Sequence, residues 1–578
     1  MKPYLSYLSF LLLYSVVFFT YQDSFDHDFT HLDDQVQVVN NPHIQSLDFA
    51  NIKAIFSSTS VGMYQPFTTL VYAIIYQFSG LNPWGYHFTA FLFHLLNGFL
   101  VFRLLQAFKL SFPLAFLLCS LYLLHPMQVE SVAWLSAFSN LCFTSFYLLS
   151  LLAYLAYQKQ GNKSYLLWSL AAFLISLLSK STAVTLPLIL LLLDYYCGHT
   201  WKLKNLLEKV PFFLLSIVFG LVTLNSREAA GHLSDLSLSF DLIDRIFLVA
   251  YSILFYPFKF LFPFELSTFY PYPELQNGFL PWVYYAALPA VLLLSFLIYR
   301  FRRKKLLWLG ALFYLLSISV MLQLVPVGNQ PTTDRYLYLP AIGLLLMVAA
   351  VDGAAENRKL WLATVFLGLT LAAKTYDRTE IWASDQLIWE DVLEKYPKVA
   401  QAHNNLGSAL LRDGKSKEAF QHYNEAVKLK PYYADAYSNR GNLYSQMGKS
   451  EAAMADFNRA IKLRPHADAY FNRANEKVKL GQLQAALEDY TKSIELKPSA
   501  DAYTNRAFAK LRLRNSSAAK QDLEKAIRTN PNFAQAYFLK GMMAQQQNQL
   551  TTACQEFQKA AQLGDAKAKQ ALQRFCMP

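Results

Sequence analysis

Long apolar runs separated by short polar breaks fill the chain up to about Lys374, and a polar pattern with helical periodicity follows them. A helix that crosses a bilayer needs ~20 apolar residues, and fewer when it packs inside a bundle. The runs therefore predict a polytopic membrane region with about 11 spans. These candidate spans lie near residues 4–20, 86–107, 112–124, 138–157, 164–179, 182–197, 209–225, 282–299, 306–325, 336–351 and 359–375.

The first run follows a lone Lys2 and is followed by YQDSFDHD. A secretory signal peptide would end at a small-x-small cleavage site, which these residues do not offer. We therefore expect a retained first transmembrane helix.

Basic residues orient the spans, because lysine and arginine are enriched in cytoplasmic loops. The basic clusters are Arg103 with Lys109, Lys159 with Lys163, Lys202 to Lys209, and Arg300 to Lys305. They share one side if Met1 is inside and residues 226–281 stay outside. The segment 246–262, which Pro257 and Lys259 interrupt, is then interfacial or re-entrant, and a crossing there would break the parity. The predicted outer face carries 21–65, His125–Glu130, Ser179–Ser181, Asn329–Arg335 and everything after Tyr376.

The polar C-terminal region repeats with a period near 34 residues. Prolines at 397, 431, 465, 498 and 531 lie 34, 34, 33 and 33 residues apart. Small residues where paired helices cross keep the same phase, as at Gly407, Gly441 and Ala474, and large apolar residues follow them, as at Tyr423 and Phe457. This pattern predicts an array of tetratricopeptide (TPR) helix pairs, whose stacking forms both the core and a superhelical groove.

The fold class predicted from these patterns is all-α, a polytopic transmembrane bundle followed by a TPR α-solenoid. The expected parts are a first transmembrane helix (1–20), an outer loop with an interfacial helix (21–85), the bundle (86–376), a connecting helix (377–400), about five TPRs (401–563) and a capping helix (564–578).

One polar position recurs through the repeats. Asparagine occupies it at Asn405, Asn439, Asn472 and Asn505. On the first helix of each pair this position should line the groove, and an amide can both donate to and accept from the main chain of a peptide. The ladder resembles that of the TPR superhelix in cytosolic O-GlcNAc transferase. Alternatively, Asn-Arg is a solvated groove motif in which Arg440, Arg473 and Arg506 offer charge.

The net charge and the cysteine spacing limit which partners and cofactors we expect. A net charge of +12 could indicate nucleic acid, but the basic cytoplasmic loops of a membrane protein explain it, so we expect membrane lipid and no nucleic acid. Among the five cysteines, Cys554 and Cys576 could pair in an oxidising compartment. No CxxC occurs, so neither a zinc site nor a redox site is supported.

The first outer loop contains an acidic pair, Asp33-Asp34, within FDHDFTHLDDQVQVVNNPHI. A carboxylate at a membrane surface can deprotonate an acceptor hydroxyl or hold a divalent cation. Taken alone, an Asp-Asp pair is more often part of a solvated loop.

Four further blocks follow the pair in order: YQPFTTLVYAIIYQFSGLNPWGYH (64–87), LLHPMQVESVAWL (123–135), LSKSTAVTLPLILLLLDYY (178–196) and PVGNQPTTDRYLYLPAIG (326–343). Together with WASDQLIWEDVLEKYP (382–397) and the repeats, they resemble the transmembrane-and-TPR O-mannosyltransferase family and its bacterial relatives over essentially the whole chain. That resemblance implies a GT-C glycosyltransferase whose donor is a polyprenyl-phosphate sugar. No phosphate loop and no GxGxxG motif is present.

The resemblance also implies roles for particular residues. Asp33 or Asp34 would be the base that deprotonates a serine or threonine hydroxyl, and Arg335 would grip the donor phosphate bidentately. Lys180 would add a second cation, and interfacial snorkelling is the alternative for both Lys180 and Arg335. His125 and Glu130 could orient the sugar or polarise the phosphate, although His125 next to Pro126 could simply cap a helical turn.

The chain also departs from that family. Gln65 and Phe138 stand where members often carry basic residues, and an SKE-like triplet appears as Ser179-Lys180-Ser181. A weakened basic set would fit another donor, or a fold kept without activity. The resemblance leaves metal dependence open, with a divalent cation at Asp33 and Asp34 as the candidate.

The function expected from the resemblance is transfer of a sugar, such as the hexose mannose, to hydroxyls of extracytoplasmic proteins bound by the TPRs. The alternative is a non-catalytic membrane-anchored TPR scaffold. A transporter is third, because the polar residues gather on one outer face rather than at mid-membrane. We expect a bacterial inner membrane with periplasmic TPRs, or the endoplasmic reticulum with luminal TPRs if the source is eukaryotic.

Overall fold

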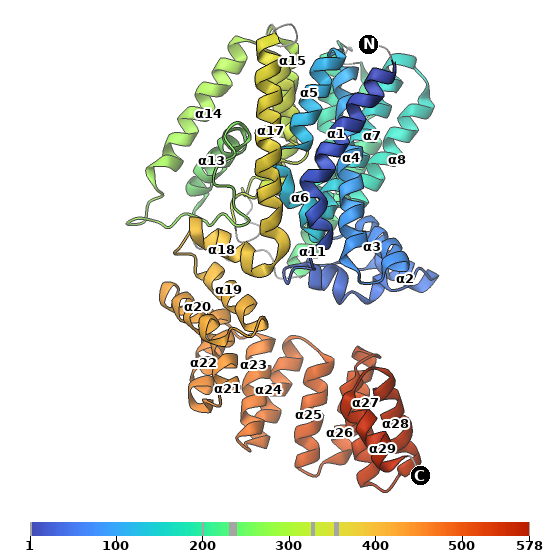
Figure 1. The fold of residues 1–578 in the computed structure, drawn as a ribbon, viewed down its shortest axis with the longest axis vertical. Coiled ribbons are helices and arrows are strands. Elements are labelled where there is room, and N and C mark those ends of the chain that lie inside the picture. Colours follow the sequence, from blue (N-terminus) through green and yellow to red (C-terminus); the bar gives the residue numbers. More distant parts are fainter. Residues whose placement is uncertain (1–2, 199–201, 230–239, 325–329, 352–357, 577–578) are drawn as a thin grey trace. The chain divides into compact units, whose positions relative to one another are not determined.

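The computed structural model describes residues 3–198, 202–229, 240–324, 330–351 and 358–576. The chain divides into two compact units, Met1–Tyr396 and Pro397–Pro578, each described by itself below (Figure 1). Asn329 of the predicted outer face and part of the predicted loop 226–281 lie outside the described residues. The predicted all-α class is confirmed, since these residues contain helices and only two isolated β-bridges.

The first unit is a helical bundle with a long loop between its first two long helices. The loop holds η1 (Gln22–Asp26), η2 (Gln35–Val39), η3 (Pro42–Ile44), α2 (Phe49–Ser57) and α3 (Pro66–Ser79). The bundle helices are α1 (Pro3–Tyr21), α4 (Pro83–Ala107), α5 (Phe112–Leu123), η4 (Pro126–Gln128), α6 (Val129–Ala133), η5 (Leu135–Ala137), α7 (Phe138–Gln160), α8 (Lys163–Ser179), η6 (Ser181–Thr185), α9 (Leu186–Cys197), α10 (Leu203–Leu207), α11 (Val210–Ala229), α13 (Leu242–Leu261), α14 (Trp282–Arg300), α15 (Lys305–Ile318), η7 (Ser319–Met321), η8 (Asp334–Leu337), α16 (Ala341–Ala349) and α17 (Arg358–Glu380). A connector of η9 (Ile381–Ala383) and α18 (Asp385–Lys395) ends the unit.

Five helices in the described residues are long and apolar enough to cross a membrane, and a sixth span results if the bent pair Phe112–Leu123 and Pro126–Ala133 counts as one. Three further apolar helices are shorter, namely Lys163–Ser179, Ser181–Cys197 and Lys305–Met321. The number of spans stays a prediction. Polar breaks cause the shortening, because the helices stop at the segments that carry His125 and Lys180.

Close helix crossings hold the bundle together. A Cβ on Gly310 would lie 2.6 Å from the carbonyl oxygen of Gly343, and one on Gly343 would lie 2.5 Å from the amide nitrogen of Tyr314. Small residues at such crossings allow backbones to approach closely in an apolar solvent. Ser150 and Ser169 exchange hydrogen bonds between α7 and α8, at 2.8 and 2.9 Å.

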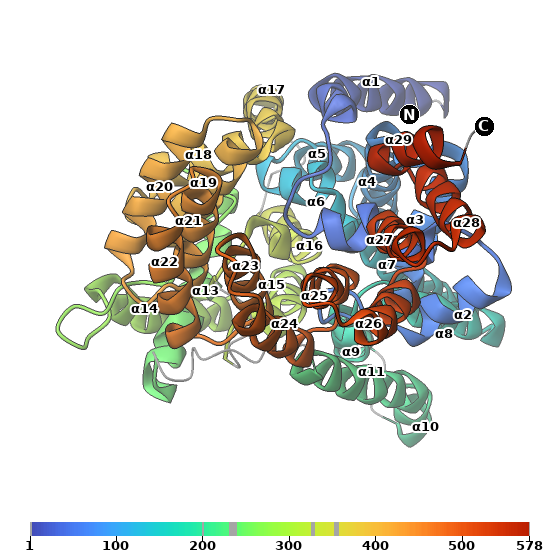
Figure 2. The ribbon, with the colours of Figure 1, turned by 90° about the horizontal axis from the view of Figure 1, so that it is seen from below.

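The second unit stacks five helix pairs in sequence order (Figures 1 and 2). The pairs are α19 (Ala400–Arg412) with α20 (Ser416–Leu429), α21 (Ala434–Gln446) with α22 (Ser450–Leu463), α23 (Ala467–Lys479) with α24 (Leu483–Leu496), α25 (Ala500–Arg512) with α26 (Ser516–Thr529), and α27 (Ala534–Gln546) with α28 (Leu550–Gln562); α29 (Ala566–Phe575) follows. The small residues sit where the pattern predicts close contact: a Cβ on Gly407 would lie 2.9 Å from the Tyr423 ring.

The arginines of the Asn-Arg motif form ion pairs within the repeats. Arg440 donates to both carboxylate oxygens of Asp456, at 2.7 and 2.8 Å, which joins the two helices of its pair. Arg473 with Asp489 and Arg506 with Asp522 repeat this bidentate contact. These arginines therefore clamp the repeats, and their charge is largely neutralised where they lie.

A disulfide joins Cys554 of α28 to Cys576 directly after α29, with 5.7 Å between their Cα atoms. It fastens the last helix to the array. Cys119, Cys142 and Cys197 are free.

Candidate active site

The acidic loop is anchored to the bundle through Asp34. This residue precedes η2, is buried, and accepts hydrogen bonds from both the amide (3.0 Å) and the hydroxyl (2.8 Å) of Thr30. Its other oxygen accepts from the amide (2.8 Å) and the hydroxyl of Ser136 in η5. Burial raises the pKa of Asp34, and these hydrogen bonds act in the opposite direction.

Asp33 is less buried than its neighbour. Its carbonyl oxygen accepts from the amides of Val36 (3.1 Å) and Gln37 (2.9 Å), so it begins the same helical turn. Its carboxylate lies close enough to Arg335 to act on the charge of that guanidinium. The two acidic side chains therefore have different surroundings, one held by hydroxyls and amides and the other in the field of a cation.

Arg335, whose side chain is 17% exposed, forms an ion pair with the buried Glu130 of α6. The guanidinium contacts one carboxylate oxygen, and the Arg335 amide donates to the other at 2.8 Å. The guanidinium also lies over the rings of Trp134 (5.1 Å) and Tyr336 (5.2 Å). Burial alone would lower the pKa of Arg335, but the Glu130 carboxylate, ahead of other partners, raises it above its usual value.

Lys180 lies in the break between α8 and η6, and its ammonium group donates to Asn140 Oδ1 at 2.5 Å. Burial, followed by repulsion from the Arg335 and Arg227 charges, lowers the pKa of Lys180 to about 7. Lys180, Arg335 and Arg227 therefore share one electrostatic neighbourhood.

His125 is engaged elsewhere. Its Nδ1 accepts from the amide of Met127 at the start of η4, and its Nε2 lies 2.9 Å from the carbonyl oxygen of Phe260, whose ring stacks on the imidazole at 4.7 Å. Both ring nitrogens thus have protein partners, as the capping alternative expects. Its role toward a sugar stays a prediction.

Two features of this region escaped the sequence patterns. Asp334 is buried beside the predicted arginine, accepts a hydrogen bond from the Tyr270 hydroxyl (2.7 Å) and lies 3.7 Å from the guanidinium of Arg378 on α17. Arg378 also pairs with Asp391 of α18 at 3.1 Å. The connector is therefore tied by charge to the segment that carries Arg335. Arg227 is the other missed residue, and its place just after an apolar run was the available signal.

Gln65 and Phe138, which stand where the family often has basic residues, are both packed against neutral side chains. Gln65 is buried and donates to Gln37 Oε1 at 3.0 Å. The Phe138 ring packs against those of Phe93 (5.0 Å) and Tyr72 (5.8 Å). Neither position adds to the cation cluster.

The described residues contain no group of three or more His, Cys, Asp or Glu side chains placed to hold a metal ion. The carboxylate oxygens of Asp34 already accept protein hydrogen bonds. A divalent cation at Asp33 and Asp34 stays a prediction.

In the TPR unit, a cavity of about 500 Å³ lies between successive first helices. Asn439 and Asn472 of the predicted ladder line it, together with Asn442 and Asn475, which the ladder did not include. Asn439 also donates to Asn404 (2.9 Å), and Asn505 donates to Asn475 (2.9 Å). Asn405 accepts from Asn404 at 3.1 Å. The amides thus form two hydrogen-bonded groups along this row, Asn405–Asn404–Asn439 and Asn475–Asn505.

These features define a class: an all-α protein with apolar bundle helices, an acidic loop near an arginine–glutamate ion pair, and a TPR array. Tetratricopeptide repeat models match residues 434–466 and 467–499, a TPR repeat model matches 407–448, and another matches 504–570.

The resemblance to the transmembrane-and-TPR O-mannosyltransferases is confirmed by relatives that bear that name. The chain is 26% identical over 445 residues to "Protein O-mannosyl-transferase F38B6.6" of Caenorhabditis elegans, covering 73% of this chain and 62% of the relative. It is 23% identical over 485 residues to human "Protein O-mannosyl-transferase TMTC1", covering 71% and 54%. The chain thus spans between half and two thirds of the length of these relatives. Among solved structures, MamA is similar over 28% of this chain and 97% of its own, at 23% identity and a TM-score of 0.26.

Proposed function

We propose that this protein transfers a sugar, mannose in the first instance, from a polyprenyl phosphate to serine or threonine hydroxyls of extracytoplasmic proteins. The observation that carries the proposal is that one short segment, which contains Glu130 and Ser136, contacts both the acidic loop and Arg335. Glu130 in that segment holds Arg335, and Ser136 holds Asp34. The names of the relatives support protein O-mannosyl transfer.

The charges suit both halves of such a reaction. Departure of the polyprenyl phosphate from the sugar needs positive charge at the leaving oxygen, which Arg335 and Lys180 supply. Attack by the acceptor hydroxyl needs a base on the other side of the sugar carbon, and a carboxylate of the outer loop supplies it. A donor anchored in the bilayer by its lipid needs no nucleotide site.

The two acidic residues take different roles in this proposal. Asp33 is the base, because its carboxylate lies in the electrostatic field of the Arg335 guanidinium. Asp34 is a positioning residue, since its oxygens are held by Thr30 and Ser136. Glu130 likewise orients Arg335 rather than the sugar.

The groove of the TPR unit presents the acceptor. Its amide row suits the main chain of an extended segment, whatever the side chains. Because the Cys554–Cys576 disulfide is of a kind that persists in oxidising compartments, it supports an outer location for the TPRs.

Intact masses of extracytoplasmic proteins test the function. Cells with the wild-type protein should show hexose-sized additions that are absent from a deletion strain. The double variant Asn439→Ala/Asn472→Ala should weaken binding of an acceptor segment by roughly 10- to 30-fold, at about 1 kcal/mol for each lost amide contact. Gln521→Ala, on the exposed face of α26, is the control. Unchanged masses in the deletion strain, with partners still captured by the groove, would leave the scaffold function instead.

A pH prediction follows from Lys180. Its pKa is lowered to about 7, so its charge is full below that pH and is lost as the pH rises through it. The KM for the lipid donor should therefore rise above about pH 7, while Lys180→Arg, which stays charged, should give a flat KM profile. Steady-state kinetics in detergent between about pH 6 and 9 measure this. A wild-type donor KM that does not change with pH would remove Lys180 from the phosphate site.

A further inference from the structure

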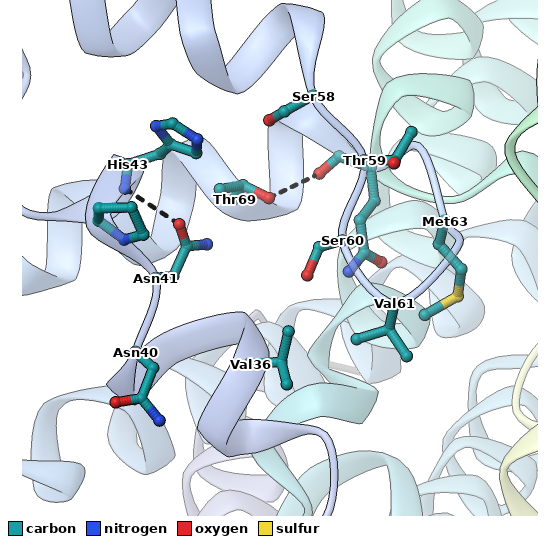
Figure 3. A pocket seen from close by; sticks show the side chains of 12 residues that line it. Val36, Asn40, Asn41, His43, Ser58, Thr59, Ser60, Val61, Met63 and Thr69 are labelled. Atoms are coloured by element: carbon teal, nitrogen blue, oxygen red, sulfur yellow. Dashed lines mark hydrogen bonds between the residues drawn. The ribbon is translucent and has the colours of Figure 1, made fainter. Parts of the chain in front are cut away.

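A second cavity, of about 230 Å³, lies in the outer loop beside the acidic pair (Figure 3). It is formed within the loop and the start of α3, apart from the Glu130–Arg335 pair. Its lining consists of Val36, Asn40, Asn41, Pro42, His43, Ser58, Thr59, Ser60, Val61, Met63, Gln65 and Thr69. The mechanism proposed above uses none of these side chains.

The cavity adjoins the proposed base through the backbone. Asp33 begins the helical turn whose next residues include Val36, a wall of the cavity, and Gln37. Gln37 in turn accepts a hydrogen bond from Gln65, which lines the cavity from the opposite side of the loop. The helical turn that begins at the proposed base therefore also supplies a wall of the cavity.

Buried polar atoms in this cavity lack partners in the described structure. Gln65 is 3% exposed, and its Oε1 accepts no hydrogen bond there. The Ser60 hydroxyl is also buried without a partner. In Figure 3, Asn41 and Ser60 extend toward the open centre from opposite sides. Buried polar atoms usually find partners, so unsatisfied ones facing a cavity indicate a ligand that donates and accepts hydrogen bonds.

The lining also defines the ligand's charge and size. It contains amides, hydroxyls, one imidazole and four apolar residues, and no Asp, Glu, Lys or Arg. A charged group would lose its hydration without gaining a counter-charge. The volume is below the ~300–1,000 Å³ usual for small-molecule sites, so it suits one short segment. The donor's sugar is attached to its phosphate and so belongs between the cations and the base.

We propose that this cavity is the acceptor subsite that receives uncharged residues next to the serine or threonine being glycosylated. The inference rests on the proposed function and deepens it by naming the acceptor class, a hydroxyl residue with uncharged neighbours. Gln65 Oε1 can accept a hydrogen bond from a peptide amide, and the Ser60 hydroxyl can donate one to a peptide carbonyl.

Direct labelling tests the subsite without relying on turnover. The full-length protein in detergent is mixed with a short synthetic peptide of alanines around one threonine, with photo-leucine next to the threonine. After irradiation, mass spectrometry should locate crosslinks in residues 36–43 and 58–69. Crosslinks confined to other segments would overturn the proposal.

Kinetics provide the second test, with polyprenyl-phosphate mannose as donor. Asn40 is an exposed residue at the rim, so Asn40→Trp should fill the cavity without disturbing the core. The KM for the peptide should rise about tenfold, with donor KM and kcat unchanged. Gln45→Trp, exposed on the same loop and outside the cavity, should behave as wild type.

The outcomes separate the two proposals. If the wild type transfers no sugar but the cavity is crosslinked, the glycosyltransferase proposal fails and a peptide site stands. If the wild type transfers sugar but Asn40→Trp leaves the peptide KM unchanged, the subsite proposal fails alone. A rise in donor KM instead would assign the cavity to the sugar and also overturn the proposal.

Discussion

Asp33→Asn is expected to lower sugar transfer by roughly 10²- to 10⁴-fold, the usual contribution of a general base. The substitution keeps the shape of the side chain and removes its ability to take a proton. The acceptor hydroxyl then has to lose its proton to water, while donor binding through Arg335 is kept. Transfer rates and donor KM of the purified variant measure this, and Asp28→Asn, an exposed aspartate of the same loop, is the matched control.

Asp34→Asn should also lower sugar transfer, but for a different reason, namely a loss of stability. An amide nitrogen cannot accept the hydrogen bonds that Asp34 receives from Thr30 and Ser136, and a lost partner for a buried donor costs about 1–3 kcal/mol. The melting temperature of Asp34→Asn should therefore fall. An intact melting temperature with lost activity in Asp34→Asn, together with active Asp33→Asn, would reverse the roles. Full activity in both would remove the pair from catalysis.

Local patterns were sufficient for the fold class. The 34-residue period predicts the repeats because each pair places a small residue against a large apolar side chain, as Gly407 lies against Tyr423. The apolar runs predict helices because their lengths match what a helix needs to cross a bilayer or a bundle. Their division into spans was harder, because bundle packing allows helices that stop at polar breaks such as Lys180.

The sequence predicted which residues belong to the site, but not which of them contact one another. Arg335 and Glu130 came from the family resemblance, but their pairing joins positions 205 residues apart, and no local spacing encodes it. The anchoring of Asp34 by Ser136 is of the same kind. Both depend on how the bundle folds back on itself, which a periodicity cannot show.

The two residues of the Asn-Arg motif have different roles. The sequence alone suggested that the arginines present their charge in the groove. In the structure, Arg440 instead forms an ion pair with Asp456 on the other helix of its pair. The missed signal was an aspartate sixteen residues after each arginine, at Asp456, Asp489 and Asp522. Lys540 and Glu556 make the equivalent contact in the last pair at 2.6 Å. The asparagines next to the arginines are left to line the groove.

Arg335→Met is expected to destabilise the protein and to abolish donor binding together. The variant leaves Glu130, which is only 2% exposed, as a buried carboxylate without its cation. Breaking such a pair from one side costs about 3–5 kcal/mol, because the remaining charge is uncompensated. Thermal unfolding in detergent should show a clear fall in melting temperature. Loss of activity in this variant alone would therefore not distinguish a structural role from a chemical one.

The double variant Glu130→Met/Arg335→Met separates the two roles. Replacing both partners of a buried ion pair by apolar residues of similar size is often neutral or stabilising, so the melting temperature should recover. Donor binding should not recover, because a methionine cannot hold a phosphate, and the donor KM should stay at least tenfold above wild type. Thermal unfolding and donor titration on the same preparation provide both readings. A double variant that is stable and binds the donor as well as wild type would show that Arg335 only holds the bundle together, and the phosphate site would then have to be built on Lys180 and Arg227.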